Sequence, residues 1–402
     1  KCTNLHHGIV INDKFMEVIH RATKEENFDD SWELIDPHSN EVKKVVSART
    51  LWVKILQNRM ETGEPYLMFE DAVNQDLPEF QKKKGLYVNH SNLCSEITLA
   101  TNEERTAVCC LSSVNLEYYD EWSKIPAFIP DLVRMLDNVL QYFIDNAPEQ
   151  MEKAKYSAMR ERSIGLGAMG YHAYLQKNQI PFESLGASAA NYTMFKHIKE
   201  DALHETRRLA VELGACPDDD TCEVRNAHLL AIAPNASSSI ICGNTSPSIE
   251  PFRANAYTQK TKSGSFLQKN KYLEQLLEDK DANTEAVWRD IVSNKGSVQH
   301  LELLSDDEKE VFKTAVEINQ SWIVEHAAQR QEFVCQSQSV NLFFPPDVTK
   351  GDLHNVHMLA WAKNLKTLYY LRSEAISRAD NVSNQVKREI IFEQEDCLAC
   401  EG

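Results

Sequence analysis

Segments with the periodicity of helices alternate with short apolar segments typical of strands, and this alternation most constrains how the 402-residue chain can fold. Helical spacing of apolar residues marks 41–62, which ends before Gly63, and a long segment at about 189–213, which ends before Gly214. The apolar run HLLAIAP at 228–234 reads as a buried strand. Strands that alternate with helices predict an α/β fold.

Further segments complete this pattern. Residues 85–100 and 105–119 are predicted to be short and rich in β-structure, and residues 306–330 to form a charged helix. The sequence shows no internal repeat and no clear domain boundary before a polar, acidic stretch close to the C-terminus. We therefore predict one α/β unit over 1–375, followed by a flexible tail over 376–402.

Charge and cysteine content exclude several classes of protein. The formal net charge is -17 and no basic stripe stands out, so neither nucleic acid nor an anionic membrane is an expected partner. No apolar run reaches the length of a membrane span and no signal peptide is recognisable, which predicts a cytoplasmic protein. Its ten cysteines are then expected to be mostly reduced thiols, with any disulfide more readily catalytic than structural.

A compact set of reactive groups lies in VNHSNLCSEITLA. Asn92, Cys94 and Glu96 stand at positions i, i+2 and i+4, so in an extended strand all three side chains would point to one face. An amide, a thiol and a carboxylate would then share one site. The alternative is a buried cysteine in a strand with two incidental polar neighbours.

Two more cysteine motifs follow. In AVCCLSSVNL, neighbouring strand residues face opposite sides, so only one of Cys109 and Cys110 can share an interior with Cys94, and Cys110 is expected to be a structural thiol. Cys397 and Cys400 form a C-x-x-C pair close to the end of the chain. A zinc half-site is one reading, but zinc requires four ligands and the sequence has no second motif of this kind. Thiol–disulfide exchange by a mobile dithiol is favoured, and no metal site is predicted.

Two other motifs carry little information by themselves. Tyr369 and Tyr370 follow a helical segment in LKTLYYLRS, where adjacent tyrosines are most often packing residues. The serine loop, which we define as residues 234–238 (PNASS), follows the buried strand. Hydroxyls and free backbone N–H groups at a helix start can hold a phosphate, although a generic polar loop is the simpler interpretation.

Together and in this order, the motifs resemble those of one family, the large catalytic subunit of class I ribonucleotide reductase. The matching stretches are SNLCSEI, AVCCLSSVNL, ACP at 215–217, PNASSSIICGNTSPSIEP, LKTLYY and the C-terminal CLAC. They extend from about residue 8 to the end of the chain. The resemblance implies the C-terminal part of a ten-stranded α/β barrel, with Cys94 on a loop inside it.

The resemblance also implies roles for individual residues. Cys94 would become a thiyl radical that abstracts the ribose 3′-hydrogen, Glu96 would take the 3′-hydroxyl proton, and Asn92 would position the sugar hydroxyls. Tyr369 and Tyr370 would carry the radical from the small subunit to Cys94.

The remaining cysteines and the serine loop have implied roles as well. Cys109 would be one member of the dithiol that reduces the 2′-position, and Cys397 and Cys400 would re-reduce that dithiol, with thioredoxin or glutaredoxin as their own reductant. The substrate would be bound by Ser91, Pro234, Asn235, Ala236, Ser237 and Ser238, with the phosphates at the two serines. Asn235 and Ala236 differ from some members of the family.

The implied reaction converts ribonucleoside diphosphates to 2′-deoxyribonucleoside diphosphates for DNA synthesis. The chain would bind no cofactor, since the di-metal/tyrosyl radical cofactor belongs to the small subunit, and nucleotide effectors would bind an N-terminal part. That part, and the second cysteine of the reducing dithiol, are not recognisable upstream of SNLCSEI. We therefore expect this chain to be the C-terminal half of the subunit, working with an N-terminal half.

Two rival interpretations remain open. An adenosylcobalamin-dependent reductase also has a radical cysteine and a tail dithiol, but it needs no tyrosine relay, so Tyr369 and Tyr370 argue against it. A non-enzymatic subunit kept for assembly would have no reason to retain Cys94 and Glu96 together with the tyrosine pair.

Overall fold

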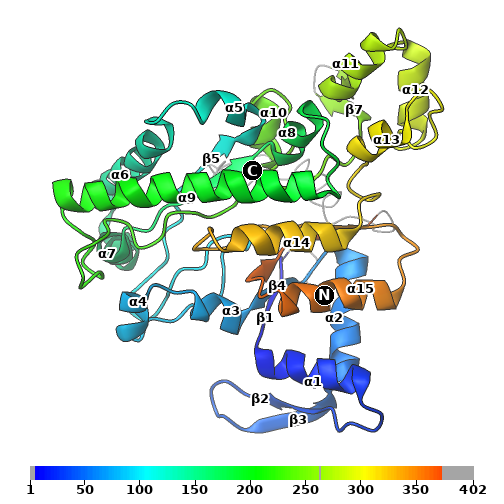
Figure 1. Ribbon diagram of the computed structural model, residues 1–402. Helices are drawn as coiled ribbons and strands as arrows, with labels where there is room; N and C mark the ends of the chain where they lie inside the picture. The colour runs from blue at the N-terminus through cyan, green and yellow to red at the C-terminus, as the bar shows by residue number, and fades with distance from the viewer. Residues whose placement is uncertain (1–4, 262–263, 374–402) are drawn as a thin grey trace.

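The computed structural model describes residues 5–261 and 264–373, and it shows strands and helices alternating along the chain (Figure 1). The strands are β1 Gly8–Ile11, β2 Ser31–Ile35, β3 Val42–Ser47, β4 Tyr66–Phe69, β5 Leu111–Asn115, β6 Gly165–Met169, β7 Ala256–Thr261, β8 Gly264–Lys269, β9 Leu342–Phe344, β10 Thr367–Leu368 and β11 Leu371–Ser373. The α-helices are α1 Asp13–Lys24, α2 Ala48–Thr62, α3 Glu70–Gln75, α4 Glu79–Lys83, α5 Tyr119–Trp122, α6 Phe128–Asn146, α7 Glu152–Glu161, α8 Tyr171–Lys177, α9 Leu185–Leu213, α10 Ala236–Ile241, α11 Lys271–Asp279, α12 Glu285–Ser293, α13 Asp306–Val311, α14 Gln320–Gln331 and α15 Lys350–Ala362. Two short 3₁₀ turns are Leu116–Tyr118 and Glu149–Met151.

The central strands pair mostly in parallel. β1 is parallel to β4, β5 to β6 and β9 to β11, while β10 lies antiparallel on the other edge of β4. Parallel bridges join Leu166 to Leu230 and Ile232 to Gln338, so that extended segments outside the named strands continue the β5–β6 pair. Parallel neighbours require crossover connections, which the helices between them supply.

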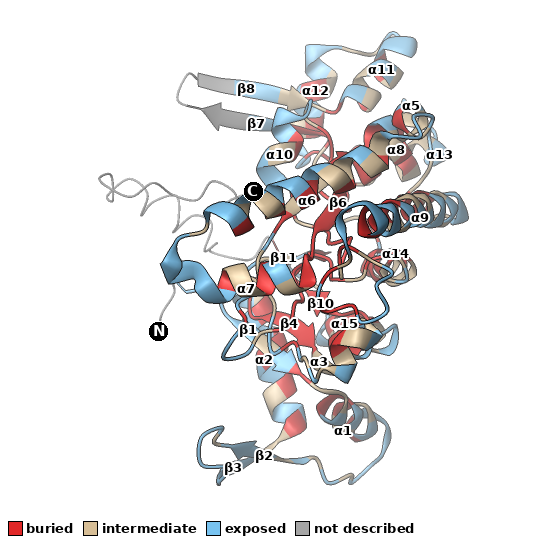
Figure 2. Ribbon diagram, turned by 90° about the vertical axis from the view of Figure 1, so that its left-hand side faces the viewer, coloured by how far each residue is buried: buried red, intermediate tan, exposed pale blue. Residues whose placement is uncertain are grey.

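The core lies along these strands, between the covering helices. Every residue of β4 and of β6 is buried, as expected for strands covered on both faces (Figure 2). Helix α9 packs against α6 and α14 on the outside of this core (Figure 1). Gly167 of β6 allows the 231 backbone to come close, because an added Cβ would lie 2.4 Å from the Ala231 carbonyl oxygen.

Two hairpins, neither predicted from the sequence, project at opposite ends of the molecule (Figure 2). β2 and β3 form one of them, and β7 and β8 form the other. Beside the second hairpin, helices α11 to α13 enclose a small core of their own, which includes Leu273, Trp288 and Phe312. This part of the chain is therefore a lobe attached to the main core.

Several predicted boundaries are confirmed, and others are wrong. Helices α9 and α2 end at Gly214 and Gly63 as predicted, and Gly63 has the left-handed conformation. However, α2 starts only at its cap, Ser47, because the residues before it form β3. The single helix predicted over 306–330 is wrong. It is two helices, because Asn319 caps the start of α14.

Most of the predicted unit over 1–375 falls within the described residues. These residues form the large main core and the smaller core of the lobe beside it. The predicted tail over 376–402 lies outside them. Across 5–261 and 264–373, no helix is both long enough and apolar enough to cross a membrane.

Candidate active site

The segment around Cys94 is a tight turn and not the strand that its spacing suggests. The amide of Ser95 donates to the Asn92 carbonyl oxygen at 3.2 Å, and the Ile97 amide donates to Asn92 Oδ1 at 3.0 Å. Ser95 adopts a positive φ of 70°. The prediction that residues 85–100 form β-structure is therefore wrong, because local hydrogen bonds from an asparagine compete with extended pairing. We call residues 92–97 the cysteine turn.

A neighbouring segment holds the cysteine turn from the other side. Ser339 is buried, and its hydroxyl contacts both the Cys94 carbonyl oxygen at 2.6 Å and Glu96 Oε2 at 3.2 Å. The Ser337 amide donates to the Glu96 carbonyl oxygen at 2.9 Å. Ser339 is not predicted from the sequence, since a serine in QSQSVNL gives no local signal for this contact.

Glu96 is a buried carboxyl group in a polar setting. Its exposed fraction is 2%, and burial raises the pKa of Glu96 above the usual carboxyl value. Hydrogen bonds from the Asn92 side chain and the Ser339 hydroxyl oppose that effect by stabilising the charged form. A carboxyl group with a raised pKa is suited to exchange a proton with a bound ligand.

Of the two predicted tyrosines, Tyr369 lies against Cys94 and Tyr370 packs on Tyr369. Tyr369 is buried, and its phenol is hydrogen-bonded to the Cys94 side chain. The ring centroids of Tyr369 and Tyr370 are 4.5 Å apart, with the planes inclined at 56°. Burial, followed by the nearby thiol, raises the pKa of Tyr369, so this phenol stays protonated at neutral pH. Residues 275 positions apart are thus joined in one contact chain, which we call the thiol–phenol chain: Cys94, Tyr369 and Tyr370.

Arg59 of α2 supports this arrangement from within the core. It is fully buried, and burial lowers the pKa of Arg59 to about 9. Its guanidinium donates to the Tyr369 carbonyl oxygen at 3.1 Å, to the Pro65 carbonyl oxygen and to His357 Nε2 at 3.1 Å. One side chain thereby ties the tyrosine segment to β4. Arg59 is not predicted from the sequence, because there it looks like any helical arginine.

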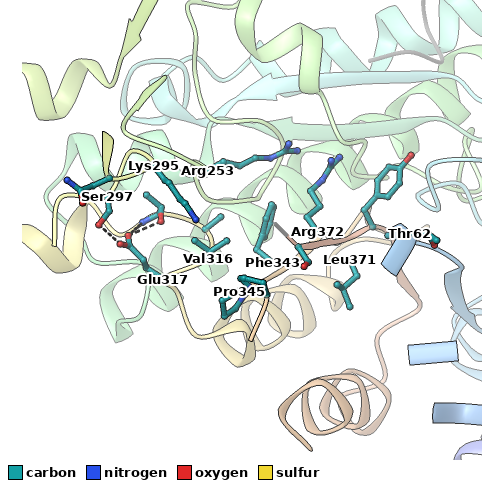
Figure 3. A pocket seen from close by; sticks show the side chains of 17 residues that line it. Thr62, Arg253, Lys295, Ser297, Val316, Glu317, Phe343, Pro345, Leu371 and Arg372 are labelled. Atoms are coloured by element: carbon teal, nitrogen blue, oxygen red, sulfur yellow. Dashed lines mark hydrogen bonds between the residues drawn. The ribbon is translucent and has the colours of Figure 1, made fainter. Parts of the chain in front are cut away.

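A surface cavity adjoins the outer end of the thiol–phenol chain. Its volume is about 400 Å³, and its lining includes Tyr370, Arg372 and Arg253 (Figure 3). The Arg372 guanidinium lies 4.6 Å from the centroid of the Tyr370 ring. Glu317 accepts hydrogen bonds from Ser297 and the Thr314 amide at the far end of the cavity. The chain of contacts therefore runs from the cysteine turn to an accessible surface.

The paired cysteines have different environments, as the alternation of strand faces predicts. Cys110 is buried in the main core, and burial raises the pKa of its thiol to about 11. Its thiol donates weakly to the Leu136 carbonyl oxygen at 3.5 Å. Cys109 is exposed, just before β5. Cys110 is thus a structural thiol, while Cys109 stays a candidate for chemistry.

Pro234 and Asn235 of the serine loop precede α10, while Ala236, Ser237 and Ser238 form its first turn, and one side chain anchors the segment. Asn235 Nδ2 donates to Ser113 Oγ of β5 at 3.0 Å and to the Ala233 carbonyl oxygen at 3.1 Å. The amide of Asn235 thus faces the protein, and not the surface. Pro234 is buried, Ser238 is half-buried, and Ala236 and Ser237 are exposed.

Other predicted site residues are placed as follows. Ser91 precedes the cysteine turn, and its hydroxyl donates to the Asn92 carbonyl oxygen at 3.1 Å. Cys397 and Cys400 lie outside the described residues. Within 5–261 and 264–373, no group of three or more His, Cys, Asp or Glu side chains is arranged to hold a metal ion.

Comparisons with known proteins agree with these features. Residues 1–223 and 218–371 match the family of the ribonucleotide reductase barrel domain. The Frog virus 3 (isolate Goorha) relative, a ribonucleoside-diphosphate reductase large subunit, is 49% identical over an alignment of 405 positions, which covers 100% of this chain and 70% of that protein. The large subunit of Invertebrate iridescent virus 3 is 47% identical over 97% of this chain and 63% of its own length.

A solved structure is similar as well. The class Id ribonucleotide reductase alpha subunit of Actinobacillus ureae superposes with a TM-score of 0.82 at 38% identity, covering 92% of this chain and 65% of that one. This chain thus spans roughly two thirds of the length of these relatives. The fold prediction is confirmed, and the chain belongs to the ribonucleotide reductase family, in which it corresponds to the barrel domain of the large subunit.

Proposed function

We propose that this chain forms the catalytic part of a ribonucleoside-diphosphate reductase, which makes 2′-deoxyribonucleoside diphosphates by thiyl-radical chemistry. The observation that carries the proposal is the thiol–phenol chain, in which Cys94 is hydrogen-bonded to Tyr369 and Tyr369 packs on Tyr370. The curated relatives named above support the reaction class.

Each group then has a task. An electron leaves Tyr370 for the oxidised small subunit, and the radical passes through Tyr369 to Cys94. The Cys94 thiyl takes the 3′-hydrogen of the ribose, while Glu96 takes the proton of the 3′-hydroxyl. The 2′-hydroxyl leaves as water with a proton from the dithiol that Cys109 forms with a second cysteine outside the recognised motifs. This dithiol supplies two electrons and two protons in all and becomes a disulfide, and Cys94 returns the 3′-hydrogen to the product.

The proposed partners follow from this sequence of steps. The radical originates at a di-metal/tyrosyl cofactor of the small subunit, and the second cysteine and the effector sites belong to an N-terminal part of the large subunit. Cys397 and Cys400 reduce the disulfide by thiol exchange, and thioredoxin or glutaredoxin reduces them in turn. Exposed hydroxyls in the serine loop, such as that of Ser237, suit contact with the substrate phosphates. All of this chemistry is expected in the cytoplasm.

Phenylalanine variants of the two tyrosines test the proposal. Tyr369→Phe and Tyr370→Phe each remove only a hydroxyl, so the full-length subunit should lose about 1 kcal/mol of folding stability for the lost hydrogen bond. Phenylalanine is not oxidised at an accessible potential, so deoxynucleotide formation with the small subunit and dithiothreitol should fall to background. Tyr142→Phe, on a residue that is 71% exposed, is the matched control and should keep normal turnover.

Near-normal turnover in either variant would mean that the tyrosines only pack. The adenosylcobalamin-dependent reading would then return, and addition of adenosylcobalamin should change the absorbance spectrum and restore turnover. If Tyr142→Phe also lost turnover, the assay would not report on the tyrosine pair. A titration of small-subunit binding to each variant would then separate lost assembly from lost oxidation.

A further inference from the structure

A third phenol packs against both tyrosines of the thiol–phenol chain, although no motif includes it. Tyr66 is the first residue of β4 and is 5% exposed. Its ring centroid lies 4.6 Å from that of Tyr369 and 5.0 Å from that of Tyr370. The phenols of Tyr66 and Tyr370 also share a hydrogen bond. Tyr66 therefore touches the chain at the residue nearest to the surface cavity.

The hydroxyl of Tyr66 faces a carboxylate on its other side. It donates to Glu64 Oε1 at 3.3 Å, and His6 Nδ1 lies 3.3 Å from the same hydroxyl. Glu64 is buried, and it also accepts hydrogen bonds from the His7 amide at 3.0 Å and from the His6 ring. A carboxylate can only accept, and a phenol has one proton to donate. When Tyr66 donates to Glu64, its lone pairs are therefore available to the Tyr370 hydroxyl.

The geometry is that of a short proton path. The order Tyr370, Tyr66, Glu64 runs from the outer tyrosine to a carboxylate, and His6 beside the carboxylate has a side chain that is 42% exposed. Burial, followed by the neighbouring phenols, raises the pKa of Tyr66. Tyr66 thus keeps a proton at neutral pH, and it can take one from Tyr370 only by giving its own to Glu64.

We propose that Tyr66 and Glu64 accept the proton that Tyr370 releases on oxidation and return it on reduction. This inference rests on the proposed function and deepens it. Tyr370 loses one electron to the oxidised residue of the small subunit, its proton moves to the Tyr66 oxygen, and the Tyr66 proton moves to the Glu64 carboxylate. Tyr370 then takes a hydrogen atom, an electron together with its proton, from Tyr369. Both protons move back from Glu64 and Tyr66 when the small subunit returns the electron to Tyr370 after turnover, so nothing is consumed.

The path matters because a phenol that is oxidised without losing its proton becomes a cation, and an uncompensated charge in a buried setting is costly. Neighbouring cations add to that cost. The titratable and charged groups that face Tyr66, Glu64 and Tyr370 are His6 and His7 from the segment before β1, Arg59 from α2, Cys94 from the cysteine turn, and Tyr369 and Arg372 from the end of the described chain. His6 is hydrogen-bonded to Glu64, so it needs a separate variant.

The test uses the full-length large subunit assembled with its small subunit, with cytidine diphosphate as substrate and dithiothreitol as reductant. Tyr66→Phe keeps the ring contacts and removes the acceptor. We expect kcat to fall about tenfold, KM to stay within about twofold, and kcat to rise with pH between about pH 6 and about pH 9, because the proton must then leave to solvent. Glu64→Gln should give the same pH dependence, and Glu64→Asp should restore part of the rate.

Tyr87→Phe is the matched control, because its phenol also donates to a carboxylate, Glu70 Oε1, at 2.6 Å. It should leave kcat and the pH profile unchanged. His6→Gln keeps the carboxylate, and it should not cause the tenfold loss of kcat. A Tyr66→Phe enzyme with the kcat and pH profile of the unmodified enzyme would overturn the inference, as would a loss of kcat without a change in pH dependence, which indicates a packing role.

Failure of this inference can be told apart from failure of the proposed function. If the unmodified enzyme is active and Tyr370→Phe is inactive while Tyr66→Phe is normal, only the proton path is wrong. If Tyr370→Phe is itself active, the tyrosine relay fails and the proton path fails with it.

Discussion

Two short segments carry most of the predicted chemistry, and the protein builds them in opposite ways. The cysteine turn is held at three points, by its own Asn92, by Ser339 and by the phenol of Tyr369. The serine loop is anchored by Asn235, and its Ser237 is exposed. A reactive sulfur radical needs a fixed, shielded position, whereas a phosphate-binding loop needs groups that are open to an incoming ligand. Replacements should therefore have large effects on rate in the cysteine turn and small effects on binding in the serine loop.

The largest effect is expected at the thiol. Cys94→Ser should abolish deoxynucleotide formation by the full-length subunit, including a single turnover, because a hydroxyl does not form the corresponding radical. Folding stability should change by no more than about 1 kcal/mol, the usual contribution of one hydrogen bond. Cys222→Ser, at an exposed cysteine, is the control and should remain active. Residual turnover by Cys94→Ser above background would contradict the role of this residue.

The second-largest effect is expected at Ser339, whose hydroxyl holds the cysteine turn. Ser339→Ala leaves the Cys94 carbonyl oxygen and the Glu96 carboxylate without their shared donor, so it should cost about 1–3 kcal/mol in the free energy of unfolding. Turnover should fall at least about tenfold, because small displacements at a reacting centre are costly. Denaturant unfolding and a turnover assay measure the two effects.

Ser157→Ala is the matched control for Ser339→Ala. Ser157 is also a buried serine, and it donates to a carboxylate, Glu161 Oε1, at 3.3 Å. It should lose stability without a specific loss of turnover. Equal turnover losses in the two variants would mean that Ser339 acts only through stability, and the contrast between the two loops would then weaken.

The pH dependence of turnover should report the burial of Glu96. A base acts in its ionised form, and the raised pKa of Glu96 places the acid limb of kcat above the ordinary carboxyl value of 4.5. Asn92→Ala removes a hydrogen bond that lowers this pKa, so the acid limb should move to higher pH. The raised pKa also means that the folded protein binds this proton more tightly than the unfolded chain does. Protonated Glu96 therefore stabilises the fold at low pH, and this stabilisation is lost as the pH rises through the raised pKa. Asn89→Ala, at an exposed site, is the control and should leave the acid limb of kcat in place. A shift of the acid limb to lower pH in Asn92→Ala would contradict the assignment of Glu96 as the base.

The smallest effects are expected in the serine loop, where two variants separate anchoring from binding. Ser237→Ala removes an exposed hydroxyl, so stability should stay within about 0.5 kcal/mol while KM for the diphosphate rises a few-fold with kcat retained. Asn235→Ala breaks the bonds to Ser113 and to the Ala233 carbonyl oxygen and should cost about 1–2 kcal/mol of stability. Thermal unfolding and substrate titration distinguish them. If Ser237→Ala lowers kcat and leaves KM unchanged, the loop is not a simple binding element.

The sequence by itself singled out the residues that are predicted to carry the chemistry in their side chains. Cys94, Glu96 and the two tyrosines were found from motifs, and the α/β fold and the ends of α2 and α9 were found from periodicity and glycine caps. These signals are local: a cap acts within a few residues, and a motif is read from its neighbours. The same local reasoning misjudged the cysteine turn as a strand, because alternation of polar and apolar residues does not reveal an asparagine that bonds back to its own backbone.

Tertiary structure alone decided which distant residues meet those side chains. Ser339 lies 243 positions from the Glu96 that it contacts, and Arg59 lies 310 positions from the tyrosine carbonyl that it holds. Tyr66 joins the tyrosine pair only because β4 and β10 are neighbours in one sheet. Such contacts depend on strand pairing and on the cost of leaving a buried donor or acceptor unsatisfied, and both are properties of the folded chain as a whole. The sequence thus specified the groups that are predicted to react, while packing determined their supports, their protonation and their route to the surface.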